Sequence, residues 1–192
     1  MGITANDFFE NIYSVIFSPK AFFENKEIKI SVRLALATIV FIVFFSKLTS
    51  SIFDGSISKI TFITSFVWNI IWSVVVWFLT ALFFEYAAKI FSYYGNLNRI
   101  LFYTAFAPVP YIFFAPLNLV KQATIIGYTI GSVAEFFVYC WIITLYAYSI
   151  KSSYNISFAR AFMLIFLPFV SVFFVIYWGI CFFVKMGYIF SL

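Results

Sequence analysis

The dominant feature of the sequence is a series of long apolar runs separated by short polar connections. Five runs reach the roughly 20 residues that a helix needs to cross a bilayer. They cover about 34–52, 62–84, 100–120, 124–150 and 161–184. The apolar positions are continuous rather than alternating, which favours helices over the strands of a membrane barrel. The sequence therefore predicts an all-α polytopic membrane protein, with five transmembrane helices in a single domain over residues 1–192.

Residues 1–31 form a predicted arm before the first run. Its start, Thr4 to Asp7, has the spacing of a helix-capping sequence. Apolar residues then recur at helical spacing, at Phe8, Ile12, Val15 and Ile16. We interpret this stretch as a short amphipathic helix that lies at the membrane surface, with packing on the protein's own loops as the alternative.

Three prolines, Pro108, Pro110 and Pro116, interrupt the third apolar run. A proline inside a helix removes a backbone donor and clashes with the carbonyl four residues earlier. The third run is therefore predicted to be kinked or split, with neighbouring helices shielding the freed backbone groups. A re-entrant segment that does not cross the bilayer is the alternative.

The fourth run carries the most specific local signal, because Gly127, Gly131 and Glu135 are spaced four residues apart on one helix face. Glycines at this spacing let another helix approach closely. An ionisable group inside a membrane is costly, so Glu135 is predicted to face protein rather than lipid. Candidate partners are Lys47, Asn69 or a carbonyl freed by the prolines. The carboxyl is neutral if burial dominates and charged if Lys47 reaches it.

Composition fits a membrane protein and argues against several functions. Hydrophobic residues make up 65% of the chain and charged residues 10%, against roughly 25% charged in a soluble domain. The basic residues are scattered among the connections, which argues against nucleic-acid binding. Histidine is absent, and Cys140 and Cys181 are far apart. We therefore expect no enzymatic activity, no cofactor and no metal site.

The basic residues also predict an orientation. With five crossings, one side carries eight of them: Lys20, Lys26, Lys29, Arg33, Lys89, Arg99, Lys151 and Arg160. The other side carries four: Lys47, Lys59, Lys121 and Lys185. The positive-inside rule then places the N-terminus in the cytoplasm and the C-terminus outside.

The order of several short motifs resembles the Yip1 domain family. Residues 18–24 (SPKAFFE) are similar to the P-x-x-F-F segment before the first span of that family. The proline-bearing third span at 103–108 (YTAFAP) continues the match. So does the polar connection leading into 157–161 (SFARA), with Pro168 beyond it.

This resemblance implies a five-span protein with a cytoplasmic N-terminus, here of the short type found in prokaryotic cell membranes. Eukaryotic members are linked to Rab GTPases, but their Asp-Leu-Tyr-Gly-Pro motif is replaced by ENKEI at 24–28, so that role is not carried over. We expect a non-enzymatic membrane scaffold or partner-binding factor. Its partners would be the lipid bilayer and, as candidates, other membrane proteins or a second copy of the chain. The alternative is a small transporter, or a transporter subunit, that uses Glu135 and the broken third helix.

Overall fold

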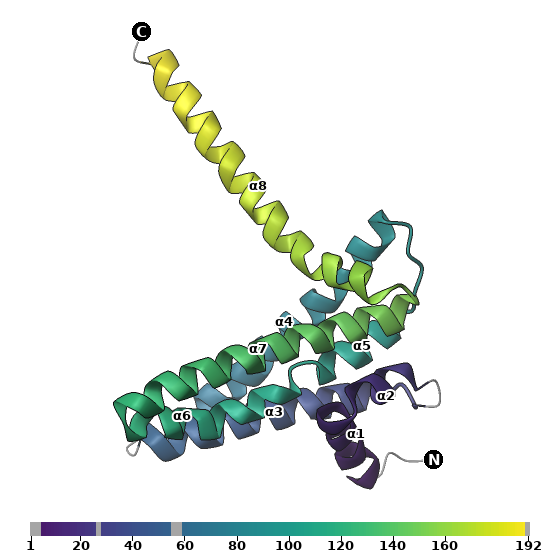
Figure 1. The fold of residues 1–192 in the computed structure, drawn as a ribbon, viewed down its shortest axis with the longest axis vertical. Helices are drawn as coiled ribbons and strands as arrows, with labels where there is room; N and C mark the ends of the chain where they lie inside the picture. The colour runs from purple at the N-terminus through teal and green to yellow at the C-terminus, as the bar shows by residue number, and fades with distance from the viewer. Residues whose placement is uncertain (1–4, 26–27, 55–58, 191–192) are drawn as a thin grey trace.

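The protein is built from helices, as a computed structural model describing residues 5–25, 28–54 and 59–190 shows (Figure 1). In chain order the helices are α1 (Ala5–Phe17), α2 (Pro19–Glu24), α3 (Val32–Asp54), α4 (Lys59–Ile90), α5 (Leu97–Phe106), the 3-10 helix η1 (Val109–Phe113), α6 (Phe114–Ala123), α7 (Ile125–Tyr154) and α8 (Phe158–Phe190). No strand occurs in these residues, so the predicted all-α class is confirmed.

Three segments of the described chain are long and apolar enough to cross a membrane: Ile60–Ile90, Leu97–Ala123 and Ile125–Tyr154. They overlap the second, third and fourth predicted runs and indicate a membrane protein. The first and fifth runs coincide with α3 and α8. The side chains at 49–54, and several from Pro168 onward, lie outside the described residues. Five crossings therefore stay a prediction.

The third run is split at two of its three prolines. Helix α5 ends at Phe106, and Pro108 and Pro110 then lie at the start of the 3-10 turn η1. Pro116, in contrast, is the third residue of α6 and does not interrupt it. The first turn of a helix has backbone N–H groups without intrahelical acceptors, so a proline there sacrifices no hydrogen bond. The prediction that Pro116 breaks a helix is wrong.

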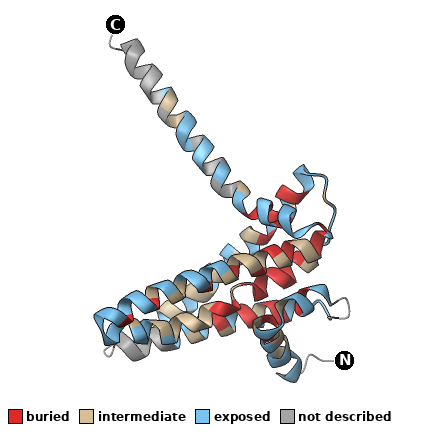
Figure 2. Cartoon of the chain, viewed as in Figure 1, coloured by how far each residue is buried: buried red, intermediate tan, exposed pale blue. Residues whose placement is uncertain are grey.

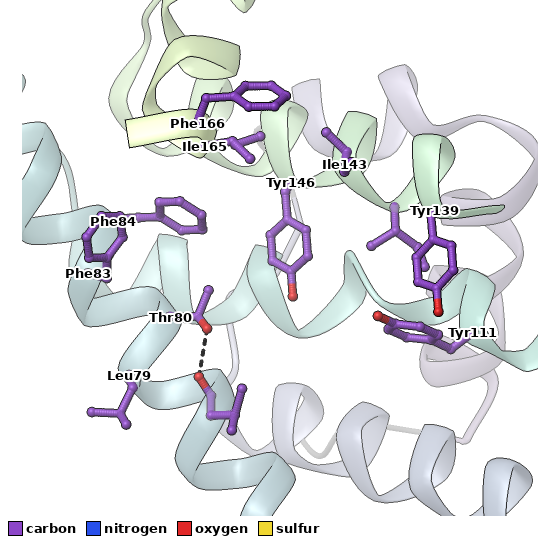
Figure 3. A pocket seen from close by; sticks show the side chains of 12 residues that line it. Leu79, Thr80, Phe83, Phe84, Tyr111, Tyr139, Ile143, Tyr146, Ile165 and Phe166 are labelled. Atoms are coloured by element: carbon purple, nitrogen blue, oxygen red, sulfur yellow. Dashed lines mark hydrogen bonds between the residues drawn. The ribbon is translucent and has the colours of Figure 1, made fainter. Parts of the chain in front are cut away.

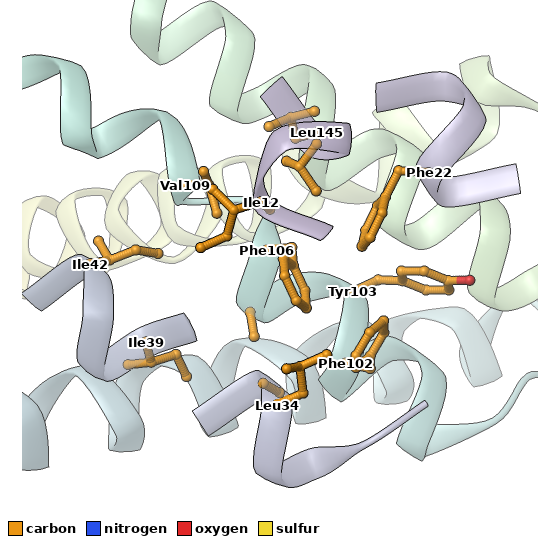
Figure 4. Packing of buried hydrophobic residues seen from close by; sticks show 14 of the residues in the cluster. Ile12, Phe22, Leu34, Ile39, Ile42, Phe102, Tyr103, Phe106, Val109 and Leu145 are labelled. Carbon is orange, nitrogen blue, oxygen red and sulfur yellow. The ribbon is translucent and has the colours of Figure 1, made fainter. Parts of the chain in front are cut away.

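Helix α5 lies at the centre of the tightest packing, with every side chain at 100–106 buried. Two aromatic side chains of α2 insert beside it: the Phe22 ring lies 5.2 Å from that of Phe106, and the Phe23 ring 5.4 Å from that of Tyr103 (Figure 4). Tilted ring contacts of this kind add to the favourable free energy of burial. The buried residues gather at this end of the bundle, whereas the outer faces of α4 and α7 stay exposed (Figure 2).

The apolar face of α1 packs on the protein. Ile12 and Val15 are buried in the same cluster as the α5 residues, and Phe8 and Ile16 pack against it. The side of α1 that the sequence assigns to the bilayer is therefore turned inward. An aromatic stripe, Phe9, Tyr13 and Phe17, is exposed on α1 instead. A bilayer contact of α1 stays a prediction, and this exposed stripe is now the surface expected to make that contact.

The connections that the sequence assigns to one side of the membrane meet at one end of the bundle (Figure 1). The Glu24 carboxylate of α2 pairs with the Lys151 ammonium of α7 at 2.5 Å. The Tyr154 hydroxyl donates to the Glu85 carboxylate of α4 at 2.6 Å. In the connection between α4 and α5, Gly95 lies so close to the Tyr154 ring that a Cβ atom would overlap it. The arm and two connections thus form one packed polar end.

Candidate functional site

Glu135 lies on the face of α7 that packs against α6, where its carboxylate pairs with the ammonium of Lys121 at 2.5 Å. The two side chains are 21% and 18% exposed, so most of the pair is shielded. The predicted pairing of Glu135 with Lys47 or Asn69 is wrong. The Asn69 amide instead donates to the Ser65 carbonyl of its own helix at 2.6 Å.

The true partner was missed because the sequence places Lys121 in a connection. Helix α6 continues to Ala123, and Thr124 alone joins it to α7. The Thr124 side chain caps α7 by accepting a hydrogen bond from the Gly127 N–H at 2.9 Å. The chain therefore reverses within one residue, and Lys121 stays on helix α6 beside α7.

The two glycines of the fourth run make this tight hairpin. A Cβ atom at Gly127 would overlap the carbonyl oxygen of Val120 in α6. At Gly131 a Cβ atom would lie 2.5 Å from Cγ of Lys121. Because Gly131 has no side chain, the aliphatic stem of Lys121 can occupy this space and reach Glu135. The glycines serve a helix contact within the chain.

The hairpin pair does not have the form of a proton relay. Relays in membranes use successive ionisable groups. The Lys121 ammonium has one further neighbour of note, the Tyr128 ring, whose centroid is 5.7 Å away. The other two ion pairs between described side chains, Glu85–Lys89 and Glu24–Lys151, belong to the polar end. Glu135 and Lys121 therefore neutralise each other within the hairpin.

A second feature is an apolar groove of about 780 Å³ bounded by α4, η1, α7 and the start of α8 (Figure 3). Cavities that bind small molecules have roughly this size. Polar atoms in the lining come from Thr80 and from the hydroxyls of Tyr111, Tyr139 and Tyr146. The Thr80 hydroxyl already donates to the Val76 carbonyl at 2.8 Å. The groove is suited to a largely hydrocarbon occupant.

Sequence reasoning missed this groove, because its residues come from four elements and are mostly apolar. Nothing in a run of apolar residues distinguishes a groove lining from a lipid-facing surface. The one usable signal was the spacing of Tyr139 and Tyr146, seven residues apart on one face of the fourth run.

No group of three or more His, Cys, Asp or Glu side chains is placed to hold a metal ion within the described part of the chain. The chain matches no family model, and no curated protein or solved structure is detectably similar to it. The class that the fold defines is thus a helical membrane protein. The likeness to the Yip1 family rests on the sequence motifs alone.

Proposed function

We propose that the chain is a non-enzymatic integral membrane protein that holds another membrane component in the groove between α4 and α7. It would act as a scaffold or partner-binding factor, as the Yip1 resemblance implies. The groove itself carries the proposal, because it is large, almost wholly apolar and flanked by two candidate membrane crossings. Such a surface binds hydrocarbon and offers no nucleophile with an activating base.

Affinity purification in a gentle detergent, with mass spectrometry of co-purifying lipids and proteins, tests this function. Ile143→Trp fills the groove and should deplete the bound component. Ile130→Trp is the matched control, since Ile130 lies on the same helix but is 58% exposed and outside the groove. Identical co-purifying components in the wild type and both variants would contradict the proposal.

A transporter is the second candidate, favoured by the helix break at Pro108 and Pro110 beside the groove. Broken helices form binding sites in many transporters. The neutralised Glu135–Lys121 pair weakens this alternative, because the carboxylate is already occupied. Substrate flux into proteoliposomes that is present in the wild type and lost in Glu135→Gln would favour transport over scaffolding.

Five crossings with a cytoplasmic N-terminus, in the cell membrane of a prokaryote, belong to the same proposal. Single cysteines at positions 125 and 155 test it in a background without Cys140 and Cys181, because Ile125 and Asn155 flank the two ends of α7. An impermeant reagent added outside the cell should label position 125, and position 155 only after permeabilisation. Equal labelling of both positions in intact cells would overturn this topology.

A further inference from the structure

The polar end of the bundle contains a pocket of about 300 Å³ between α2, α5 and α7. In contrast to the groove, its lining is rich in polar and charged side chains, among them Glu24, Arg99, Lys151, Ser152 and Asn155. Arg99 lies two residues into the candidate crossing Leu97–Ala123, and Lys151 lies three residues before the end of Ile125–Tyr154. Both cations are thus within one helical turn of the ends of crossings, which is the level of lipid head groups.

The pocket carries an excess of positive charge. Lys151 is held by Glu24 at 2.5 Å, and its ammonium lies 5.8 Å from the centroid of the Tyr148 ring. Arg99 lines the same pocket and forms no ion pair with any side chain that the structure describes. Among the described side chains that line the pocket, one carboxylate stands against two cations, which leaves an excess of one positive charge. An anion with one negative charge would balance it.

The pocket walls are fixed in position. The Ser152 hydroxyl donates to the backbone carbonyl of Phe23, which ties α2 to α7. Asn155 caps the end of α7 in the left-handed region, at φ 52°. The Arg99 backbone N–H is bonded to the Asn96 carbonyl at 2.9 Å in the first turn of α5. The backbone that carries Arg99 is therefore held in place, which lowers the part of the ordering cost of binding that comes from the main chain.

We propose that this pocket binds the phosphate of an anionic phospholipid head group. The planar guanidinium of Arg99 donates two parallel hydrogen bonds to phosphate oxygens, and Lys151 adds a second positive charge. Glu24 limits the excess to one charge, which matches a phosphodiester better than a multiply phosphorylated group. Basic pockets between membrane helices on the cytoplasmic side are known to take such head groups. This site is separate from the apolar groove and does not depend on its occupant.

Native mass spectrometry of the purified full chain, with added phosphatidylglycerol or phosphatidylcholine, tests the proposal. We expect the wild type to retain phosphatidylglycerol in preference to phosphatidylcholine. Arg99→Gln should weaken phosphatidylglycerol binding about tenfold or more, since a charge-assisted contact is lost. Arg99→Lys keeps the charge without the planar fork and should fall between the two. Arg160→Gln, an exposed arginine of α8 that does not line the pocket, is the control and should bind as the wild type does.

Three results would overturn the proposal. Equal retention of the two lipids would show that the protein does not distinguish an anionic head group from a zwitterionic one. Equal losses in Arg99→Gln and Arg160→Gln would show general attraction to the basic end. Binding of inorganic phosphate that depends on Arg99 and displaces the lipid would assign the pocket to a free anion. Far-UV circular dichroism of each variant keeps a folding defect distinct from a binding defect.

Discussion

The pair between Lys121 and Glu135 offers a direct test of the α6–α7 hairpin through the substitution Glu135→Gln. This change removes one negative charge and keeps the shape of the side chain. It leaves the ammonium of Lys121, whose side chain is 18% exposed, without its counter-ion 2.5 Å away. The lysine stem runs against Gly131, which restricts how far the ammonium can move away from position 135. Glu135→Gln should therefore be destabilising.

The expected magnitude lies between two limits. Breaking a fully buried ion pair by removing one partner costs about 3–5 kcal/mol. An exposed pair contributes about 0–1 kcal/mol. Since roughly a fifth of each side chain is exposed, we expect a loss of about 1–3 kcal/mol. Lys121→Met added to Glu135→Gln removes the unpaired charge and should restore most of that loss, whereas Lys121→Met alone should also destabilise.

Reversible unfolding in mixed micelles of mild detergent and dodecyl sulfate, followed by tryptophan fluorescence, measures these differences. Glu10→Gln is the matched control, because Glu10 is an exposed residue of α1 far from the hairpin in sequence. A Glu135→Gln variant as stable as Glu10→Gln would show that the ion pair contributes nothing to stability. A double variant no more stable than the worse single variant would show that the two side chains act independently.

Three further predictions concern other contacts. Gly127→Ala should destabilise by about 1–2 kcal/mol in the same unfolding assay, because overpacking at α6 exceeds the gain in helix propensity. Gly179→Ala, with no atom within 4 Å of the added Cβ, should be neutral or stabilising, and the reverse order would refute the close contact. The hydrogen bond from Lys151 holds the pKa of Glu24 below its ordinary value of 4.5. This contact therefore stabilises α2 fully above pH 4.5, and the stabilisation is lost as the pH falls through the lower pKa of the folded state. The protection of α2 amides, taken relative to their intrinsic exchange rates at each pH, should therefore decrease below pH 4.5, and Glu24→Gln should remove this change in protection. Phe17→Ser should reduce the quenching of a fluorescent probe on α1 by brominated lipid, because Phe17 is exposed. Ile12→Ser should mainly lower stability, because Ile12 is buried. Unchanged quenching in Phe17→Ser would argue against a bilayer contact by the aromatic stripe of α1.

The helices could be predicted from the sequence because continuous apolar runs have few alternatives inside a bilayer. The break at Pro108 and Pro110 follows from the same backbone chemistry. Pro116 shows the limit of that rule, since the effect of a proline depends on where the helix starts. The start of α6 is set by where the 3-10 turn before it ends, and although Pro108 and Pro110 mark the start of that turn, no residue pattern marks its end.

Partners across helices could not be predicted, because both lipid-facing and protein-facing surfaces are apolar here. The helical spacing of Phe8 and Ile12 correctly indicates an apolar face of α1, but this spacing cannot say whether that face meets lipid or α5. The same ambiguity hid the groove. For Glu135 the glycine spacing pointed to the contact face. The identity of Lys121 as partner depended on where α6 ends, which hydropathy does not resolve.

The hairpin geometry also bears on the proposed orientation. Lys121 is one of the four basic residues that the five-span topology assigns to the outer side. It lies within the hairpin, mostly shielded and paired with Glu135, and so does not anchor a connection in water. Removing it from the count of four leaves three basic residues outside against eight on the other side. Lys89 and Lys151 on that other side are paired too, with Glu85 and Glu24, so leaving out paired cations on both sides gives six against three and keeps the twofold bias toward a cytoplasmic polar end. That end would then face the leaflet richest in anionic lipid, where the pocket at Arg99 would find the head group it is proposed to bind.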